Sequence, residues 1–222
     1  MTWKQLFTSS IGKKFLMGFT GFFLIFYLII HAAINSLIFY NDDGATFNAA
    51  AHFMLENYIV RFLEIGLFAA FILHSVQGLL LWQQNRAARK VKYQVQKYPR
   101  EIKWFSRYMG WLGTFILLFL VMHLWHFWSA TKNELYFGGA EIDLYQSMKM
   151  IFTNPVWFGL YMIGLASLLF HLLHGFQSAL QTFGINNRRW IGILKGFGIF
   201  YSVAICLLFA SMPTAFMLGW LK

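Results

Sequence analysis

The stretch FLMGFTGFFLIFYLIIHAAINSLI, from Phe15 to Ile38, contains no Lys, Arg, Asp or Glu. It is longer than the ~20 apolar residues that a helix needs to cross the hydrocarbon core of a bilayer. Four further apolar runs of similar length follow at 59–82, 105–129, 156–181 and 190–218. The sequence therefore predicts an all-α integral membrane protein, a bundle of five transmembrane helices in a single membrane domain covering residues 1–222.

The composition is typical of a chain embedded in lipid. Hydrophobic residues make up 59% of the sequence and charged residues only 12%, which is too little polar surface for a water-exposed exterior. The net charge of +10 does not indicate nucleic acid as a partner, because the basic residues lie between apolar runs and not on the face of a soluble domain. The single cysteine, Cys206, excludes a disulfide framework or a thiolate cluster, so any metal chemistry must use histidine.

The first apolar run has an alternative interpretation as a secretory signal. Lys13 and Lys14 precede it, and His31-Ala32-Ala33 loosely resembles a cleavage site. The run is too long for a typical signal core, and cleavage there would also remove His31. We therefore favour a transmembrane helix.

The charges between the runs predict the orientation. The N-terminal segment and the segments 85–107 and 183–195 hold every Lys and Arg of the chain except Arg61, Lys132, Lys149 and Lys222. By the positive-inside rule the N-terminus is cytoplasmic and the C-terminus lies outside. The basic segment 85–107 is either a topology signal that contacts lipid phosphates or a docking surface for a cytoplasmic partner, and the two are compatible.

Two weaker features complete this description. Trp and Tyr residues near the ends of the runs, Trp128 among them, are interpreted as interfacial anchors. Outside the membrane, residues 144–152 precede Asn154-Pro155 and fit a short amphipathic helix lying on the membrane surface.

Histidines carry most of the functional information. Of the seven in the chain, all but His52 lie within predicted spans: His31, His74, His123, His126, His171 and His174. An ionisable residue at membrane depth is costly and by default faces the bundle interior with a partner or a function. One such histidine is usually a packing element, but four helices that each carry one indicate a shared site.

The depths of these histidines fall into two layers. His31 lies 18 residues after Lys13 and His123 lies 18 residues after Phe105, so both are roughly 27 Å from the cytoplasmic side. His74 and His171 each lie 15 residues after the outer start of their runs, about 22 Å inward. Equal depth on different helices is what two axial ligands of one haem require, so the sequence predicts two stacked haem groups.

Two axial histidines leave iron without an open position, which favours electron transfer over oxygen chemistry. Such a chain needs an electron donor and an acceptor and is therefore expected to be part of a larger complex. His126 and His174 each follow a predicted ligand by three residues and lie roughly on the same helical face. Either member of each couple could be the ligand, and the other could contact a haem propionate, relay a proton, bind a quinone oxygen or hydrogen-bond a neighbouring helix.

The residues resemble a known family, the single-chain dihaem cytochrome b membrane anchors of succinate:menaquinone reductases and quinol:fumarate reductases. The resemblance covers nearly the whole chain and rests on the following stretches: Gly21 to His31, Phe47-Asn48-Ala49-Ala50-Ala51-His52-Phe53-Met54, Leu63-Glu64-Ile65, His74 with Gly78, His123-Leu124-Trp125, and Phe170-His171 with Gly175. It implies that His31 and His123 bind a distal haem b and that His74 and His171 bind a proximal haem b. This agrees with the pairing by depth.

The resemblance also implies partners and a reaction. A flavoprotein and an iron–sulfur subunit would dock on the cytoplasmic side, in a bacterial inner membrane, and the whole complex could form a dimer. Electrons would pass through the two haems between the iron–sulfur subunit and menaquinone. Succinate and fumarate would not contact this chain. Candidates for the quinone site are polar groups at the outer end of the second span, where they could also simply be solvated: Glu64, which lies inside the span, and His52, Glu56 and Arg61.

Two alternatives have different signatures. The gamma subunit of membrane nitrate reductases is also a five-helix dihaem cytochrome b that oxidises quinol, but its ligands cluster on two helices, whereas here they are spread over four. A haem-free transporter would use intramembrane His and Glu64 for ion movement. The sequence shows no interrupted helices in matching halves, the usual indication of a transporter site.

Overall fold

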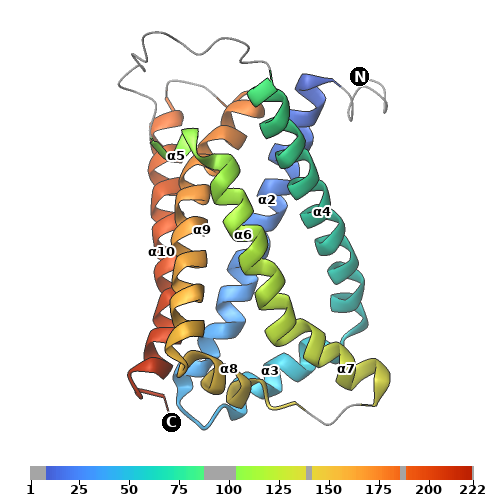
Figure 1. The fold of residues 1–222 in the computed structure, drawn as a ribbon, viewed down its shortest axis with the longest axis vertical. Helices are drawn as coiled ribbons and strands as arrows, with labels where there is room; N and C mark the ends of the chain where they lie inside the picture. Colours follow the sequence, from blue (N-terminus) through green and yellow to red (C-terminus); the bar gives the residue numbers. More distant parts are fainter. Residues whose placement is uncertain (1–8, 88–103, 139–141, 186–188, 222) are drawn as a thin grey trace.

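The computed structural model describes residues 9–87, 104–138, 142–185 and 189–221. Helices take up 89% of these residues and no strand occurs among them, which confirms the all-α class. Five helical segments in the described part are long and apolar enough to cross a membrane: Ser10–Tyr40, Tyr58–Ala87, Met109–Phe137, Pro155–Thr182 and Ile191–Met217. They run side by side along the long axis of the molecule (Figure 1). Most of the predicted basic segment 85–107 lies outside the described residues.

The first two spans agree closely with the predicted runs. The first consists of α2 (Ser10–Asn35), which Ser9 caps by accepting a hydrogen bond from the backbone N–H of Gly12 at 3.0 Å, followed by the 3₁₀ turn η1 (Ser36–Tyr40). The second is α4 (Tyr58–Ala87), preceded by Asn57, whose side-chain oxygen accepts from the backbone N–H of Ile59 at 2.9 Å.

The third span differs from the prediction at both ends. A separate helical turn, α5 (Trp104–Arg107), precedes α6 (Met109–His123). After one π-helical turn, η2 (Leu124–Trp128), the helix continues as α7 (Ser129–Phe137) instead of ending at residue 129. The prediction stopped early because Lys132 and Glu134 lower the hydropathy, whereas the helical backbone continues regardless of it. In η2 the backbone N–H of Ser129 bonds to the carbonyl of Leu124, five residues back.

The helix α3 (Ala45–Glu56) was not predicted. It starts after a turn in which Asn41, Asp43 and Gly44 all have positive φ, and Gly44 at φ 84° is the residue that tolerates this best. The Thr46 hydroxyl donates to Asp42 and holds the pKa of that carboxyl below its ordinary value. One placement is therefore corrected: His52 and Glu56 lie on α3 and not at the end of the second transmembrane helix.

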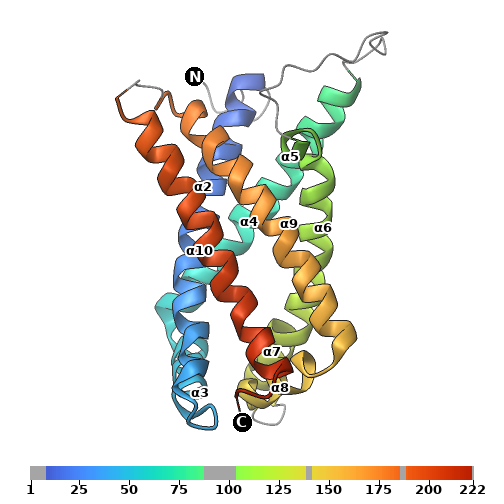
Figure 2. The ribbon, with the colours of Figure 1, turned by 90° about the vertical axis from the view of Figure 1, so that its left-hand side faces the viewer.

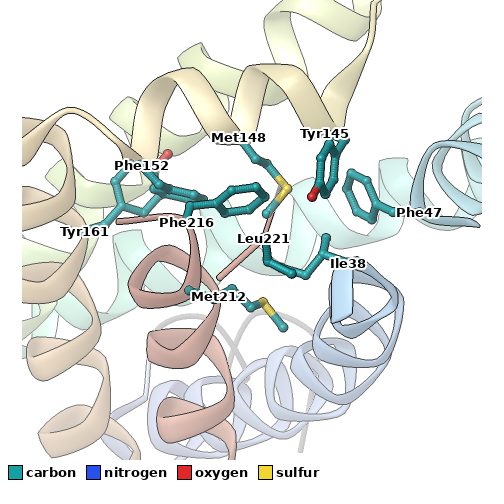
Figure 3. Packing of buried hydrophobic residues seen from close by; sticks show 10 residues of the cluster. Ile38, Phe47, Tyr145, Met148, Phe152, Tyr161, Met212, Phe216 and Leu221 are labelled. Atoms are coloured by element: carbon teal, nitrogen blue, oxygen red, sulfur yellow. The ribbon is translucent and has the colours of Figure 1, made fainter. Parts of the chain in front are cut away.

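The short helix predicted at 144–152 is confirmed as α8 (Leu144–Phe152). Asp143 caps it by accepting from the backbone N–H of Gln146 at 2.9 Å. Its apolar face is buried against the bundle and not spread on lipid, because Tyr145, Met148 and Phe152 are all buried. Figure 3 shows these side chains meeting Phe216.

The bundle has two distinct ends. We call the end at which α2 begins and α4 ends the upper end, and the end that carries α3, α7 and α8 the lower end (Figures 1 and 2). The lower end contains the larger core cluster, drawn in Figure 3: Ile38, Phe47, Tyr145, Met148, Phe152, Tyr161, Met212, Ala215, Phe216 and Leu221. The charge pattern of the sequence predicts that this end lies outside the cell.

The two sides of the bundle are packed unequally. A second core cluster joins α2 to α9 (Pro155–Thr182) and α10 (Ile191–Met217), and its members are Ala32, Leu172, Tyr201, Ile205 and Cys206. In the most apolar stretches of α9 and α10, 28% of the residues are buried, whereas none is buried in those of α4 and the α6–α7 span. The helices α4 and α6 therefore hold the less crowded side of the bundle.

Candidate functional site: two layers of paired histidines

The lower histidine pair joins α2 to α6. The ring centroids of His31 and His123 lie 5.7 Å apart and the rings are nearly perpendicular, at 88°. Aromatic rings surround the pair: Phe119 stacks on His123 with centroids 5.8 Å apart, and Tyr161 meets it edge-on at 6.1 Å. The pair predicted from equal depth therefore lies side by side.

The upper histidine pair joins α4 to α9. The ring centroids of His74 and His171 lie 6.0 Å apart with an interplanar angle of 65°. On α2, Gly21 faces His74 so closely that a Cβ at this position would lie 3.4 Å from the His74 Cε1. This second pair is also the one predicted from depth, and its surroundings are small and polar where those of the lower pair are aromatic.

One histidine of each pair has its Nδ1 held by a neighbour. Thr20 Oγ1 lies 3.3 Å from His74 Nδ1, and the same hydroxyl donates to the Leu16 carbonyl at 2.8 Å. Its proton is therefore used, so the hydroxyl accepts from Nδ1–H and the His74 Nε2 carries a free lone pair. In the lower pair, His31 Nδ1 lies 3.4 Å from both the Tyr27 hydroxyl and the Asn35 side-chain amide.

The other histidine of each pair has no such partner. The Nδ1 atoms of His123 and His171 are buried and make no hydrogen bond to any described residue. Buried polar atoms almost always have a partner, so two imidazoles without one, in equivalent positions, single out the paired histidines as candidates for binding a further group. Both features, the pairing and the missing partners, occur once in each layer.

The geometry of the pairs fits a bis-histidine haem. Two imidazoles on opposite faces of one metal have ring centroids about 6 Å apart, because each metal–nitrogen bond is about 2 Å and each ring adds about 1 Å. The observed 5.7 and 6.0 Å agree with this spacing. Among the described residues, no group of three or more His, Cys, Asp or Glu is arranged to hold a metal ion, so these two-ligand pairs are the candidates.

The two additional histidines have partners across helices. His126 Nδ1 lies 3.1 Å from the Tyr161 hydroxyl, and its ring packs against Trp157 with centroids 4.7 Å apart. His174 Nδ1 lies 2.7 Å from Ser106 Oγ. Of the interpretations left open by the sequence, the structure therefore favours a hydrogen bond to a neighbouring helix for both.

The four quinone-site candidates are separated into three groups. Glu64 lies inside α4 and accepts hydrogen bonds from Trp128 Nε1 and from Lys132 Nζ, the latter at 2.7 Å. Arg61 donates from Nε to the Leu55 carbonyl at 2.9 Å and its guanidinium lies over the Tyr58 ring.

His52 and Glu56 pair with each other on α3, with 3.5 Å between Nδ1 and Oε2, and both are largely exposed. His52 also lines a cavity of about 630 Å³ at the lower end, whose walls are Asn48, Ala49, Ala51, His52, Leu55, Thr131, Glu134, Ile142, Asp143 and Leu144. Of the four candidates, Glu64 is the partly buried residue that lies deepest in a membrane span, because Arg61 is three residues nearer the start of α4.

One curated protein is similar to this chain in sequence across most of its length. The chain is 29% identical over 160 residues to the succinate dehydrogenase cytochrome b558 subunit of Bacillus subtilis, and the match covers 72% of each chain. The chain is a homologue of a succinate dehydrogenase cytochrome b subunit. This confirms the resemblance predicted from the sequence. No family model matches the chain, and no solved structure matches it significantly.

Several contacts of this cytochrome b homologue were not predicted. Thr20, Ser106 and Tyr161 hold histidines from other helices, and which helix faces meet cannot be read from spacing alone. Lys132 was interpreted only as an outer cation and Trp128 only as an interfacial anchor, yet both bind Glu64. Tyr27 and Asn35 could have been found, because each lies four residues from His31 and therefore on its helical face.

Proposed function

We propose that this chain is the cytochrome b membrane anchor of a succinate dehydrogenase or fumarate reductase complex and that it holds two haem b groups. The observation that carries the proposal is the presence of two histidine pairs, built by four different helices, with ring centroids 5.7 and 6.0 Å apart. The homology to a succinate dehydrogenase cytochrome b subunit supports it independently.

His31 and His123 would hold the distal haem, and His74 and His171 would hold the proximal haem. Haem b, when bound, supplies reversible one-electron transfer. The chain's own residues hold the ligands in place: Thr20 fixes the tautomer of His74, and packed aromatic rings fix the orientation of His123.

The orientation and the partners follow from the charge distribution and the homology. The upper end faces the cytoplasm of a bacterial inner membrane, where a flavoprotein and an iron–sulfur subunit dock. The lower end faces outside, and menaquinone is reduced or oxidised there beside Glu64. The chain is a single membrane domain, and the complete complex is compatible with a dimer.

The experiment that tests this function uses the full chain purified in detergent and then combined with its flavoprotein and iron–sulfur partners. We expect two haem b groups per chain with low-spin spectra, and succinate-dependent reduction of a soluble naphthoquinone by the assembled complex. A preparation that folds but binds no haem would contradict the proposal and point to the transporter alternative. Two haems without any succinate-dependent reduction would point to another quinol cytochrome.

A further inference from the structure

An ion pair lies at membrane depth near the lower end of the bundle. Lys132 on α7 places its ammonium 2.7 Å from Oε2 of Glu64 on α4, and the two side chains are 14% and 23% exposed. Glu64 is the seventh residue of α4, so it lies about 9 Å beyond the first residue of that helix. The pair therefore connects two helices that belong to different spans.

The direction of the lysine is unusual. A lysine near the end of a transmembrane helix normally extends its chain toward water, because its charge is costly in the hydrocarbon region. Lys132 instead turns toward the bundle, with its ammonium also 5.7 Å from the centroid of the Tyr136 ring. Burying two charges is rarely a net gain in stability over apolar packing. Stability alone is therefore a weak explanation for the pair.

The pair has hydrogen-bonding capacity left over. Among the described residues, the Glu64 carboxylate accepts one bond on Oε1 from the Trp128 indole and one on Oε2 from Lys132. A carboxylate offers about four lone-pair sites, and an ammonium offers three donors. Glu64 can therefore accept a further hydrogen bond while Lys132 donates a further one, at adjacent points.

The neighbourhood suits a flat ring. The Trp128 indole lies beside Phe68 with centroids 5.1 Å apart, which forms an apolar wall next to the charges. Along the helical path that joins α6 to α7, Trp128 lies five residues beyond His123, which is about 7.5 Å along the axis. The hydrogen bond from Trp128 to Glu64 therefore connects the ion pair to the helix that carries His123.

We propose that Lys132 and Glu64 together bind the headgroup of the quinone, with Lys132 donating to a carbonyl of the oxidised form and Glu64 accepting from a hydroxyl of the reduced form. This rests on the proposed function and adds Lys132 to its quinone site. A quinone offers only acceptors and a quinol offers hydroxyl donors, so an adjacent donor and acceptor can hold both. No bond forms or breaks on either side chain, and the pair returns to the same state after each turnover.

The test measures binding and turnover in the assembled complex for Lys132→Met, Lys132→Arg and Glu64→Gln. With menadione as the probe, Lys132→Met should weaken binding of the oxidised form by about 10- to 100-fold, the loss expected for one hydrogen bond to a charged donor. Lys132→Arg should restore most of the binding because it keeps the charge and the donors. Glu64→Gln should weaken binding of menadiol more than binding of menadione. Lys149→Met, which removes another lysine of the lower end, should change neither.

A double variant separates binding from a structural role. Glu64→Gln with Lys132→Met removes both charges, so no unpaired charge remains to disturb the fold. If the double variant keeps both haems but still binds menadione weakly, the proposal is upheld. If it recovers wild-type binding, the pair is only structural and the proposal is overturned. Unchanged menadione binding in Lys132→Met would overturn it as well, whereas absence of haem from the wild-type chain would instead contradict the proposed function.

Discussion

The two histidine layers share one ligand type but have different surroundings. The lower pair, His31 and His123, lies among aromatic rings. The upper pair, His74 and His171, lies beside a threonine hydroxyl and a glycine. For the two proposed haems, which would share the same ligand type, hydrogen bonds, burial and nearby charge are the remaining means of setting the potential. Any difference in potential between the two layers must therefore come from these contacts.

Removing one ligand from each layer should have the largest effect. His123→Leu should abolish only the lower haem and His171→Leu only the upper one, because each pair is built from separate helices. Haem quantification per chain and redox-titrated visible spectra of the two variants check this. His126→Leu and His174→Leu are the matched controls and should keep both haems, and loss of haem in these controls would reassign the ligands.

Thr20→Val should have the next largest effect, confined to the upper layer. The change removes the acceptor for His74 Nδ1–H while keeping the shape of the side chain, and losing such a partner typically costs about 10- to 100-fold in metal affinity. Haem retention during dilution, followed separately for the two spectral components, measures it. Thr114→Val is the control, because the Thr114 hydroxyl donates only to the Gly110 carbonyl of its own helix among the described residues. An equal loss from both layers would contradict the assignment.

Gly164→Ala should disturb the lower layer by a smaller amount. A Cβ at this position would overlap the ring of Phe119, which in turn stacks on His123. Overpacking of this kind costs about 1–3 kcal/mol, and here it should appear as a shifted lower-layer spectrum with both haems still bound. Gly159→Ala on the same helix is the control, since no described atom lies within 4 Å of its added Cβ. An unshifted Gly164→Ala spectrum would show that Phe119 can move without affecting His123.

The smallest effects should come from the partners of the two additional histidines. Tyr161→Phe removes the hydroxyl next to His126, and Ser106→Ala removes the one next to His174. Each should lower stability by about 1 kcal/mol, the value of an ordinary hydrogen bond, and leave the haem count unchanged. Thermal unfolding measured alongside haem content distinguishes this from a role in haem binding, in which case the haem content itself would fall.

The sequence predicted the features that depend on one helix at a time. Hydropathy alone located the five spans, because a helix in lipid must be apolar over its whole length. The rise per residue placed His31 with His123 and His74 with His171 at common depths, although it left His126 and His174 open as alternatives to their neighbours.

The features that sequence reasoning missed depend on how helices meet. The Thr20–His74 and Ser106–His174 contacts require the rotation of each helix about its axis, which depth does not supply. The helix α3 was missed because it is too short and too polar to register as a span. Lys132 was interpreted only as a cation of the outer side, because the sequence does not show that Glu64 on α4 lies beside it.

The π-helical turn η2 has a consequence for how this protein can change through evolution. It lies between His123 and Lys132 on one continuous helical path. One residue gained or lost in a helix rotates everything beyond it by about 100°. The π-helical turn changes the rotation of α7 about the helix axis relative to α6. It therefore helps to set the direction in which Lys132 faces relative to His123. A residue gained or lost at this turn would therefore change the direction in which Lys132 faces, while His123 keeps its position beside His31.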